Sequence, residues 1–353
     1  MKKFLFVLLP LGVFAQMPNY YEGIDFSANN RDLRDDLTNL ITATHRNKLT
    51  YTPGVWDALM VSDLDPSDQT NSNVLLIYGY DNSSEPKNHR TRNKDLRNTG
   101  CSAGQCTGLW EREHVFPKSL AQPELITTSR SAGTDAHNLR AADRQMNSLR
   151  SNKPYIDATG NARSVGGNAF YPGDEWIGDV ARIMMYMYVR YNDENTQLCD
   201  PNIVAWENTN TFSPEMPDLF LKWNALDPPS ELELVRNEVI SELQGNRNPF
   251  IDNPYIATLT WGGQTATNTW SELSSTDYNL QEVKVEITPN PTTSIATINS
   301  NQFVSANLYN INGSLLQSVT TKEVNLSSYP AGIYILAITL ENGTIVTKKV
   351  IKK

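Results

Sequence analysis

The sequence predicts an α+β protein in two parts, a mostly helical domain followed by a small all-β sandwich. Leu33, Leu37 and Ile41 fall at helical spacing, and residues 179–191 are apolar nearly all round, which indicates a buried helix. Residues 285–353 instead alternate apolar and polar side chains between Asn-Gly and proline-containing turns, the pattern of short strands. A chain of 353 residues is long enough for two such domains.

Within the first domain, short strands and helices follow one another: strands at 74–78, 109–115 and 138–141, and helices at 142–150, 179–191 and 217–243. Pro117 stops the second strand, and Pro228-Pro229 divides the last segment into two helices. The methionines of the 179–191 helix favour core packing over a metal site. Residues 263–284 are rich in Thr, Ser, Asn and Gly, which predicts a linker after a domain spanning 16–262.

The first fifteen residues have the features of a secretory signal peptide. A basic start, Met1-Lys2-Lys3, precedes an apolar run that ends at Ala15. The run is too short to anchor the chain in a bilayer, and no later segment is apolar for long enough to cross one. We therefore expect an exported protein without a membrane span.

The charge of the chain is unevenly distributed. The net charge of −9 argues against a protein that coats nucleic acid through its overall charge. Between Lys87 and Arg163, however, thirteen basic residues stand against seven acidic ones. Such a stretch is expected either at a surface that faces an anion or on a solvated face without a partner.

Three cysteines, Cys101, Cys106 and Cys199, allow one disulfide in an exported protein. Cys101 and Cys106 flank a turn-like Ser-Ala-Gly-Gln spacer, which favours their pairing, with Cys106–Cys199 as the alternative. Either choice leaves one thiol over. A zinc site is not expected, because no second Cys/His pair has ligand spacing.

The segment from Arg112 to Ser119 contains residues suited to phosphodiester hydrolysis. His114 can act as a general base, because an imidazole titrates near neutrality. Glu113 is a hard oxygen ligand for Mg²⁺, and Asn147 offers a carbonyl oxygen. Adjacent residues on a regular strand point to opposite faces, so Glu113 and His114 can share a site only where the strand twists or ends.

The wider pattern resembles the bacterial endonuclease I family of His-Me finger (ββα-metal) nucleases. The resemblance rests on Arg112 to Ser119, Asp135 to Leu139 and Asn147 to Asn152, and it extends over residues 20–262. It implies a ββα-metal core in which His114 is the general base and Glu113 and Asn147 hold one Mg²⁺, with Ca²⁺ or Mn²⁺ as alternatives. It also implies products with 5′-phosphate and 3′-hydroxyl ends.

Several other residues receive roles from the same resemblance. Arg130 is expected to stabilise the transition state as the family's arginine near the phosphate. Four further residues are expected to contact the nucleic acid: Arg112, Lys118, Arg150 and Asn152. His137 and Asn138 are expected to be structural, and Asn253 stands where the family more commonly has His.

The C-terminal segment 285–353 resembles a type IX secretion sorting domain. The resemblance rests on Ile287 to Pro291, Leu308 to Gly313, Leu326 to Tyr334 and the final Lys348 to Lys353. It implies an interaction with the type IX secretion machinery and a secreted or surface location. A carbohydrate- or protein-binding sandwich is the alternative, but no exposed aromatic cluster suggests a sugar platform.

Together these features predict a monomeric, secreted, metal-dependent endonuclease of low sequence selectivity that acts on DNA, with RNA as a further substrate. No recognition-helix module suggests base-specific readout. The alternatives are an inactive nucleic-acid-binding or adhesive protein and a phosphatase for small phosphates. The long basic stretch favours a polymeric substrate over a small one.

Overall fold

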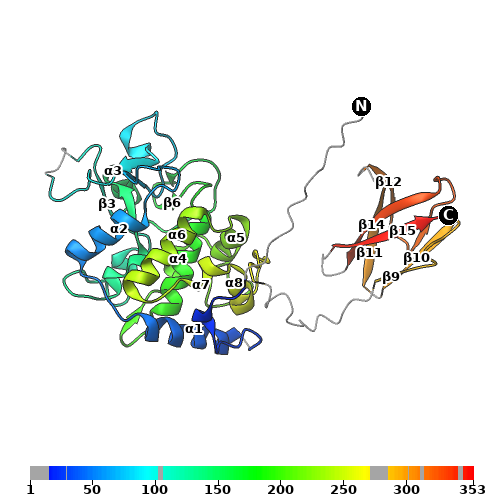
Figure 1. Cartoon of the computed structure of the whole chain (residues 1–353), viewed down its shortest axis with the longest axis horizontal. Coiled ribbons are helices and arrows are strands. Elements are labelled where there is room, and N and C mark those ends of the chain that lie inside the picture. The colour runs from blue at the N-terminus through cyan, green and yellow to red at the C-terminus, as the bar shows by residue number, and fades with distance from the viewer. Residues whose placement is uncertain are drawn as a thin grey trace. The chain divides into compact units, whose positions relative to one another are not determined.

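The computed structural model describes residues 16–28, 30–101, 106–270, 285–300, 302–310, 314–340 and 345–353. They fall into two compact units, one within residues 1–275 and the other within 276–353. The first combines helices with small sheets and the second consists of strands and turns, which confirms the α+β class (Figure 1). The predicted signal peptide (1–15), the part of the predicted linker from 271 to 284, and the Asn-Gly turns at 312–313 and 342–343 lie outside the described residues.

The first unit contains the predicted helices in the predicted order. The helices are α1 (Asn30–Thr44), α2 (Trp56–Ser62), α3 (Arg144–Arg150), α4 (Ile177–Arg190), α5 (Asp218–Leu226), α6 (Glu231–Gln244), α7 (Pro249–Asp252) and α8 (Tyr255–Trp261). Antiparallel pairs are formed by β1 (Asn73–Leu75) with β2 (Thr91–Asn93), β3 (Trp110–His114) with β4 (Leu139–Asp143), β5 (Arg163–Val165) with β6 (Ala169–Tyr171), and β7 (Asn192–Asp193) with β8 (Gln197–Leu198). The break between α5 and α6 coincides with Pro228-Pro229.

Helix α4 lies at the centre of this unit (Figure 1). Met184, Met185 and Met187 are fully buried, so the methionine run packs in the core as predicted. Arg182 on the same helix makes a two-point ion pair with Glu233 of α6, at 2.6 and 2.7 Å. Helix α4 is therefore held by apolar core packing and by an ion pair with α6.

Strands β3 and β4 pair across the loop at 115–138, and helix α3 follows β4 directly. The register pairs Trp110 with Asp143 and His114 with Leu139. Helix α3 begins directly after β4, because the Asp143 carboxylate accepts hydrogen bonds from the backbone N–H groups of Gln145 and Met146. The predicted strands and helix are thus present, with boundaries shifted by one or two residues.

The predicted strand at 74–78 is shorter than expected. β1 ends at Leu75, and Tyr78 adopts a left-handed backbone conformation with φ of 72°. At Gly79 a Cβ atom would lie 2.2 Å from the carbonyl oxygen of His89. The chain therefore turns sharply there, and only a glycine fits at the second position of the turn.

A buried ionic cluster joins α2, β4, α4 and α6. The Asp63 carboxylate accepts from the Ala141 N–H at 2.7 Å and pairs with Arg140 and Arg236. Arg140 also pairs with Asp179 of α4 at 2.5 Å. Arg236 donates to Asp63 and to the carbonyl oxygens of Ala136 and Leu139. The entry to β4 is therefore held by charged groups from three helices.

The second unit is a sandwich of two antiparallel sheets. Its strands are β9 (Glu286–Thr288), β10 (Ile295–Asn299), β11 (Phe303–Asn310), β12 (Leu315–Val319), β13 (Glu323–Asn325), β14 (Gly332–Leu340) and β15 (Ile345–Lys352). The sheets have the orders β13–β10–β9 and β12–β11–β14–β15. Ile298 of β10, Leu308 of β11 and Leu336 of β14 belong to one shared core. The predicted small all-β sandwich is therefore present.

Residues 263–270, the first part of the predicted linker, pack on the helical unit. Trp270 is 2% exposed, and its ring centroid lies 4.9 Å from that of Tyr21. The Asn253 amide donates to Asn268 Oδ1 at 2.9 Å and accepts from the Thr269 N–H at 3.2 Å. Asn253 thus has a structural use, and the helical unit continues to at least Trp270.

The favoured disulfide is present. Cys101 and Cys106 are bonded, and their Cα atoms lie 5.7 Å apart. Cys199 is buried as the remaining thiol, and burial raises the pKa of its thiol well above the ordinary range. The bond closes a short loop immediately before β3.

We expect Arg236→Ala to lower the free energy of unfolding by about 3–5 kcal/mol, because it leaves Asp63 buried with one cation fewer. Urea denaturation measures the change. Arg31→Ala removes the same charge at an exposed position in α1 and should change stability by about 0.5 kcal/mol or less. Equal stability of the two variants would show that the cluster adds nothing.

Candidate active site

A pocket of roughly 340 Å³ opens where β3 ends. It is lined by Arg112, Glu113, His114, Pro117, Lys118, Ser119, Glu124, Asn147, Arg150, Ser151 and Asn152. Strand β3 supplies Glu113 and His114, and helix α3 supplies Asn147. Every residue predicted for the site lines this pocket except Arg130. The disulfide cysteines, predicted separately, lie outside it.

Glu113 and His114 share the pocket because they are the last two residues of β3 and the regular strand ends directly after them. His114 is the last residue of β3, and Leu139 is its partner in the ladder. Beyond it, the Asn138 side chain accepts from the Phe116 N–H at 2.7 Å and donates to the Phe116 carbonyl at 3.1 Å. The regular alternation of faces therefore stops at the site.

The imidazole of His114 is held in one orientation. Its Nε2 lies 2.8 Å from the Gly133 carbonyl oxygen, and its ring stacks on Tyr51 with centroids 5.8 Å apart. A carbonyl oxygen only accepts hydrogen bonds, so Nε2 carries the proton and Nδ1 keeps its lone pair. Burial lowers the pKa of His114 to about 4, despite the Gly133 contact. At neutral pH the side chain is a neutral base.

Glu113 is 3% exposed and has two polar partners. The Tyr78 hydroxyl donates to Oε1 at 3.0 Å, and an Arg150 nitrogen lies 3.4 Å from the same oxygen. Burial raises the pKa of Glu113 to about 7, although Arg150 and Tyr78 oppose the shift. A further cation in the pocket would therefore favour the ionised carboxylate.

Asn147 is oriented by a residue that the sequence interpretation missed. Its Nδ2 donates to Glu111 Oε1 at 2.8 Å, and the Glu111 carboxylate also contacts Arg144 at 3.1 Å. Burial raises the pKa of Glu111. Glu111 stands two residues before Glu113, so alternation along β3 places both on the same face. That spacing was the signal available in the sequence.

Arg150, which was expected to contact nucleic acid, lines the pocket and also binds groups of the protein itself. It is 1% exposed and donates to the carbonyl oxygens of His114 at 3.2 Å and Val115 at 2.7 Å. It also pairs with Glu113, and its guanidinium lies 4.8 Å from the centre of the Tyr155 ring. Its two terminal nitrogens donate to backbone carbonyls, so Arg150 supports the end of β3.

Three other predicted contacts lie closer to solvent. The Arg112 guanidinium stacks on Tyr51 at 3.4 Å and donates to Thr52 Oγ1 at 3.0 Å, which holds it at the rim. Lys118 is half-buried, and Asn152 is exposed and donates to Ser119 Oγ at 3.2 Å. These side chains remain suited to an anionic ligand.

Arg130 lies in a neighbouring pocket of roughly 440 Å³, lined by Thr50, Tyr51, Thr52, Thr127, Thr128, Ser129 and Arg130. The two pockets adjoin through Tyr51, which stacks on His114 in one and lines the other. Arg130 is exposed, so it stands beside the Glu113–His114–Asn147 pocket and not in its lining.

His137, as expected, is structural. It is 2% exposed, its Nε2 lies 3.1 Å from the Asn246 carbonyl oxygen, and its ring packs on Tyr186. The adjacent Asp135 accepts hydrogen bonds from Tyr186 and Tyr191 at 2.6 and 2.9 Å. This motif residue therefore anchors the start of β4 to α4.

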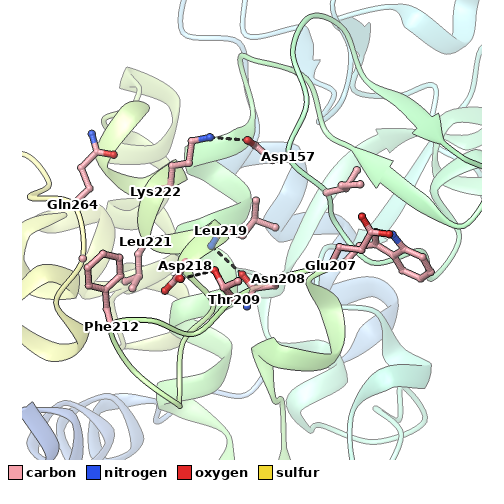
Figure 2. Close-up of a pocket in the computed structure, with 13 residues that line it drawn as sticks. Asp157, Glu207, Asn208, Thr209, Phe212, Asp218, Leu219, Leu221, Lys222 and Gln264 are labelled. Atoms are coloured by element: carbon pink, nitrogen blue, oxygen red, sulfur yellow. Dashed lines mark hydrogen bonds and ion pairs between the residues drawn. The ribbon is translucent and has the colours of Figure 1, made fainter.

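A larger cavity, of roughly 680 Å³, lies between α5 and the loops at 156–157 and 206–212 (Figure 2). Its lysine, Lys222, pairs with Asp157 at 2.6 Å, and Asp218 accepts from Thr209 at 2.6 Å. Glu207 adds a further carboxylate. The remaining walls are largely apolar, and among the charged side chains carboxylates outnumber the one lysine, which does not suit an anionic substrate. The smaller pocket is therefore the candidate active site.

A carboxylate, a neutral imidazole, an amide and several cations in one pocket are the groups that a hydrolase needs for an anionic substrate. The chain belongs to the Endonuclease I family: the model of that family matches residues 29–255. It is therefore a nuclease. Nucleases of this family are metal-dependent. The model of a secretion system C-terminal sorting domain matches residues 286–353.

Two curated proteins are similar over most of the helical unit. The extracellular ribonuclease of Bacillus subtilis (strain 168) is 34% identical in an alignment of 262 residues, and the match covers 71% of this chain and 81% of the relative. The extracellular ribonuclease of Bacillus amyloliquefaciens is 37% identical in an alignment of 239 residues, and the match covers 64% of this chain and 74% of the relative. Together with the sorting domain, they identify a secreted or cell-surface protein. Among the described residues, no helix is both long and apolar enough to cross a membrane.

The burial of His137 has a consequence for stability in acid. Its pKa is lowered to about 4 by burial, against about 6.5 in an unfolded chain. The unfolded state therefore binds a proton first as the pH falls, and stability is lost between pH 6.5 and 4. Two and a half pKa units correspond to about 3 kcal/mol at most.

We expect His137→Gln, compared with the wild type by urea denaturation at pH 7 and pH 4.5, to show a smaller loss of stability in acid. The neighbouring Asp135, His45 and Arg236 are unchanged in both proteins, so the difference isolates the imidazole. An identical acid loss in the two proteins would contradict this assignment.

Proposed function

We propose that this nuclease is a metal-dependent endonuclease of low sequence selectivity that hydrolyses phosphodiester bonds of DNA and RNA. The products carry 5′-phosphate and 3′-hydroxyl ends. The observation that carries the proposal is the meeting of Glu113, His114 and Asn147 in one pocket. RNA is included because both curated relatives are named ribonucleases. The enzyme acts as a monomer.

His114 serves as the general base. Its Nε2 is committed to the Gly133 carbonyl, so Nδ1 accepts the proton of the attacking water. The lowered pKa keeps this nitrogen unprotonated at neutral pH. The stacked Tyr51 limits rotation of the ring, which holds the lone pair in a fixed direction.

Glu113 and Asn147 fit a single Mg²⁺, with Ca²⁺ or Mn²⁺ as alternatives. They offer a carboxylate and an amide oxygen, which are hard donors, and two protein ligands leave places for waters and phosphate oxygens. Among the described residues there is no group of three His, Cys, Asp or Glu that could hold a metal ion, so the proposed site rests on Glu113 and Asn147 alone. When bound, the ion neutralises charge on the phosphate and on the leaving 3′ oxygen.

Arg112, Lys118 and Asn152 bind the backbone around the scissile phosphate. They lie at the rim of the pocket, and contacts to phosphate and sugar carry no base preference. Arg130, in the adjoining pocket, binds a flanking phosphate. Together they hold a polymer by its charge, which gives binding that weakens with salt. The β3–β4–α3 unit, on this proposal, is a ββα-metal core.

The first test is digestion of plasmid DNA and of RNA by the full chain, with Mg²⁺ and with EDTA. We expect cleavage only with the metal, and a loss of about 10²–10⁴-fold in rate for His114→Ala, the scale of general-base catalysis. His89→Ala is the control, because His89 lies outside the pocket. Intact nucleic acid after incubation of the wild type with Mg²⁺ would rule out the proposed reaction. Equal rates for His114→Ala would rule out the base.

A second test separates binding residues from supporting ones by the salt dependence of DNA binding. Lys118→Ala should reduce the slope of log affinity against log salt by about 0.9, the contribution of one phosphate contact. Arg150→Lys should leave the slope unchanged while lowering the cleavage rate, since Arg150 faces backbone carbonyls. A reduced slope for Arg150→Lys would mean that its guanidinium reaches the phosphate after all.

A further inference from the structure

We infer that Tyr78 and Glu111 are positioning residues, each of which holds one atom of a metal-binding side chain so that its other oxygen faces the cation. The inference rests on the proposed roles of Glu113 and Asn147. Neither residue touches the substrate or the metal on this view. Both act through the side chain that they contact.

Tyr78 acts on Glu113. Its hydroxyl donates to Glu113 Oε1 at 3.0 Å and lies 2.8 Å from the Tyr155 hydroxyl. The Tyr155 hydroxyl also donates to the Val115 carbonyl at 3.0 Å, which fixes its position beside Tyr78. Arg150 approaches the same Glu113 oxygen at 3.4 Å. Oε1 is thus held from the protein side, and Oε2 remains for a ligand.

The unusual backbone conformation of Tyr78 supports a positioning role for its hydroxyl. Its φ of 72° lies in a region that residues with a side chain rarely adopt, and the side chain is fully buried. The turn is secured by the Trp176 indole, which donates to the Gly79 carbonyl at 2.9 Å, and by Phe170, whose ring centroid lies 5.0 Å from that of Tyr78. Strained, well-fixed residues of this kind concentrate at functional sites.

Glu111 acts on Asn147. Its Oε1 accepts from Asn147 Nδ2 at 2.8 Å, while Oε2 is held by Arg144 at 3.1 Å and by Asn98 at 3.3 Å. A carboxylate only accepts hydrogen bonds, so the amide nitrogen must face Glu111. The amide oxygen Oδ1 is therefore turned away from Glu111. That oxygen is the atom that can bind a divalent cation.

The two contacts have one effect in common. Each of the two proposed metal-binding side chains has a second polar atom that could also face the ion. Tyr78 restrains the rotation of Glu113, and Glu111 restrains that of Asn147. Partners of this kind typically change metal affinity by about 10–100-fold when they are removed. Tyr78 and Glu111 should therefore set the affinity for the metal in the absence of nucleic acid.

Titration of the full chain with Mn²⁺ alone, followed by calorimetry, tests this inference without any substrate. Tyr78→Phe removes only the hydroxyl, and Glu111→Gln allows the Asn147 amide to face either way. We expect both to weaken Mn²⁺ binding by about 10–100-fold. Raising the Mg²⁺ concentration should restore cleavage in both variants, but not in His114→Ala.

Two control variants match the changes. Tyr191→Phe removes another buried tyrosine hydroxyl, which contacts Asp135 away from the pocket. Glu124→Gln removes the same charge as Glu111→Gln from the lining of the same pocket. Thermal melting checks that every variant is folded, and if Tyr78→Phe is not, Glu111→Gln tests the inference alone.

The outcomes separate the inference from the proposed function. Wild type that neither binds Mn²⁺ nor cleaves would overturn the proposed function itself. Wild type that does both, beside folded variants with unchanged affinity, would overturn only the positioning roles. If Glu124→Gln weakens binding as much as Glu111→Gln, the effect is one of charge, and the orientation of Asn147 is not its cause.

Discussion

The candidate active site depends on the way in which strand β3 ends. After His114 the backbone leaves the ladder, and its carbonyl groups need other partners. Arg150 donates to the carbonyls of His114 and Val115, and the Tyr155 hydroxyl donates to Val115 at 3.0 Å. Asn138 holds Phe116 from the other side. These side chains replace the missing strand and let Glu113 and His114 face one pocket.

This dependence explains why a buried arginine is found at the pocket. A lysine offers three donors around a point charge, whereas the planar guanidinium can reach adjacent carbonyls at once. Arg150 also keeps a positive charge 3.4 Å from Glu113, which is otherwise surrounded by protein. Arg150 thus holds the backbone of His114, the proposed base, and favours the ionised form of Glu113, the proposed metal ligand. Helix α3, which carries Arg150, also carries Asn147, so one helix positions both the end of the strand and the second proposed ligand.

Much of this arrangement could be predicted from the sequence, because it follows from local patterns. The apolar periodicity of α4, the prolines between α5 and α6, and the strand that Pro117 stops each left a signal in the chain. The motif blocks pointed to Glu113, His114 and Asn147, and these three residues line one pocket. Tyr78 could not be found this way, because its use depends on a left-handed turn and on a contact across 35 residues. Arg130 was placed by its position in a loop, and loops carry little periodic signal.

The charge of the basic stretch shows a further limit of sequence counting. Arg92, Arg140 and Arg150 belong to it, yet each is buried and paired with a carboxylate, respectively Asp143, Asp179 and Glu113. Their charge stabilises the interior and adds nothing to a surface field. The cations that remain toward solvent include Lys118 and Arg130, beside the two adjoining pockets. Three of the thirteen cations counted in the sequence are therefore unavailable to a polyanion at the surface.

Burial also separates the chemical roles of two adjacent residues. Removal from water disfavours charge on both, so the pKa of His114 falls to about 4 and that of Glu113 rises to about 7. For the histidine this produces a neutral base at physiological pH, with its tautomer fixed by Gly133. For the glutamate it creates a need for positive charge, which Arg150 meets only in part from one side. A second cation in the pocket would neutralise the remaining negative charge of Glu113. Asn147 lines the same pocket, and its amide oxygen could bind such a cation without adding a second negative charge beside Glu113.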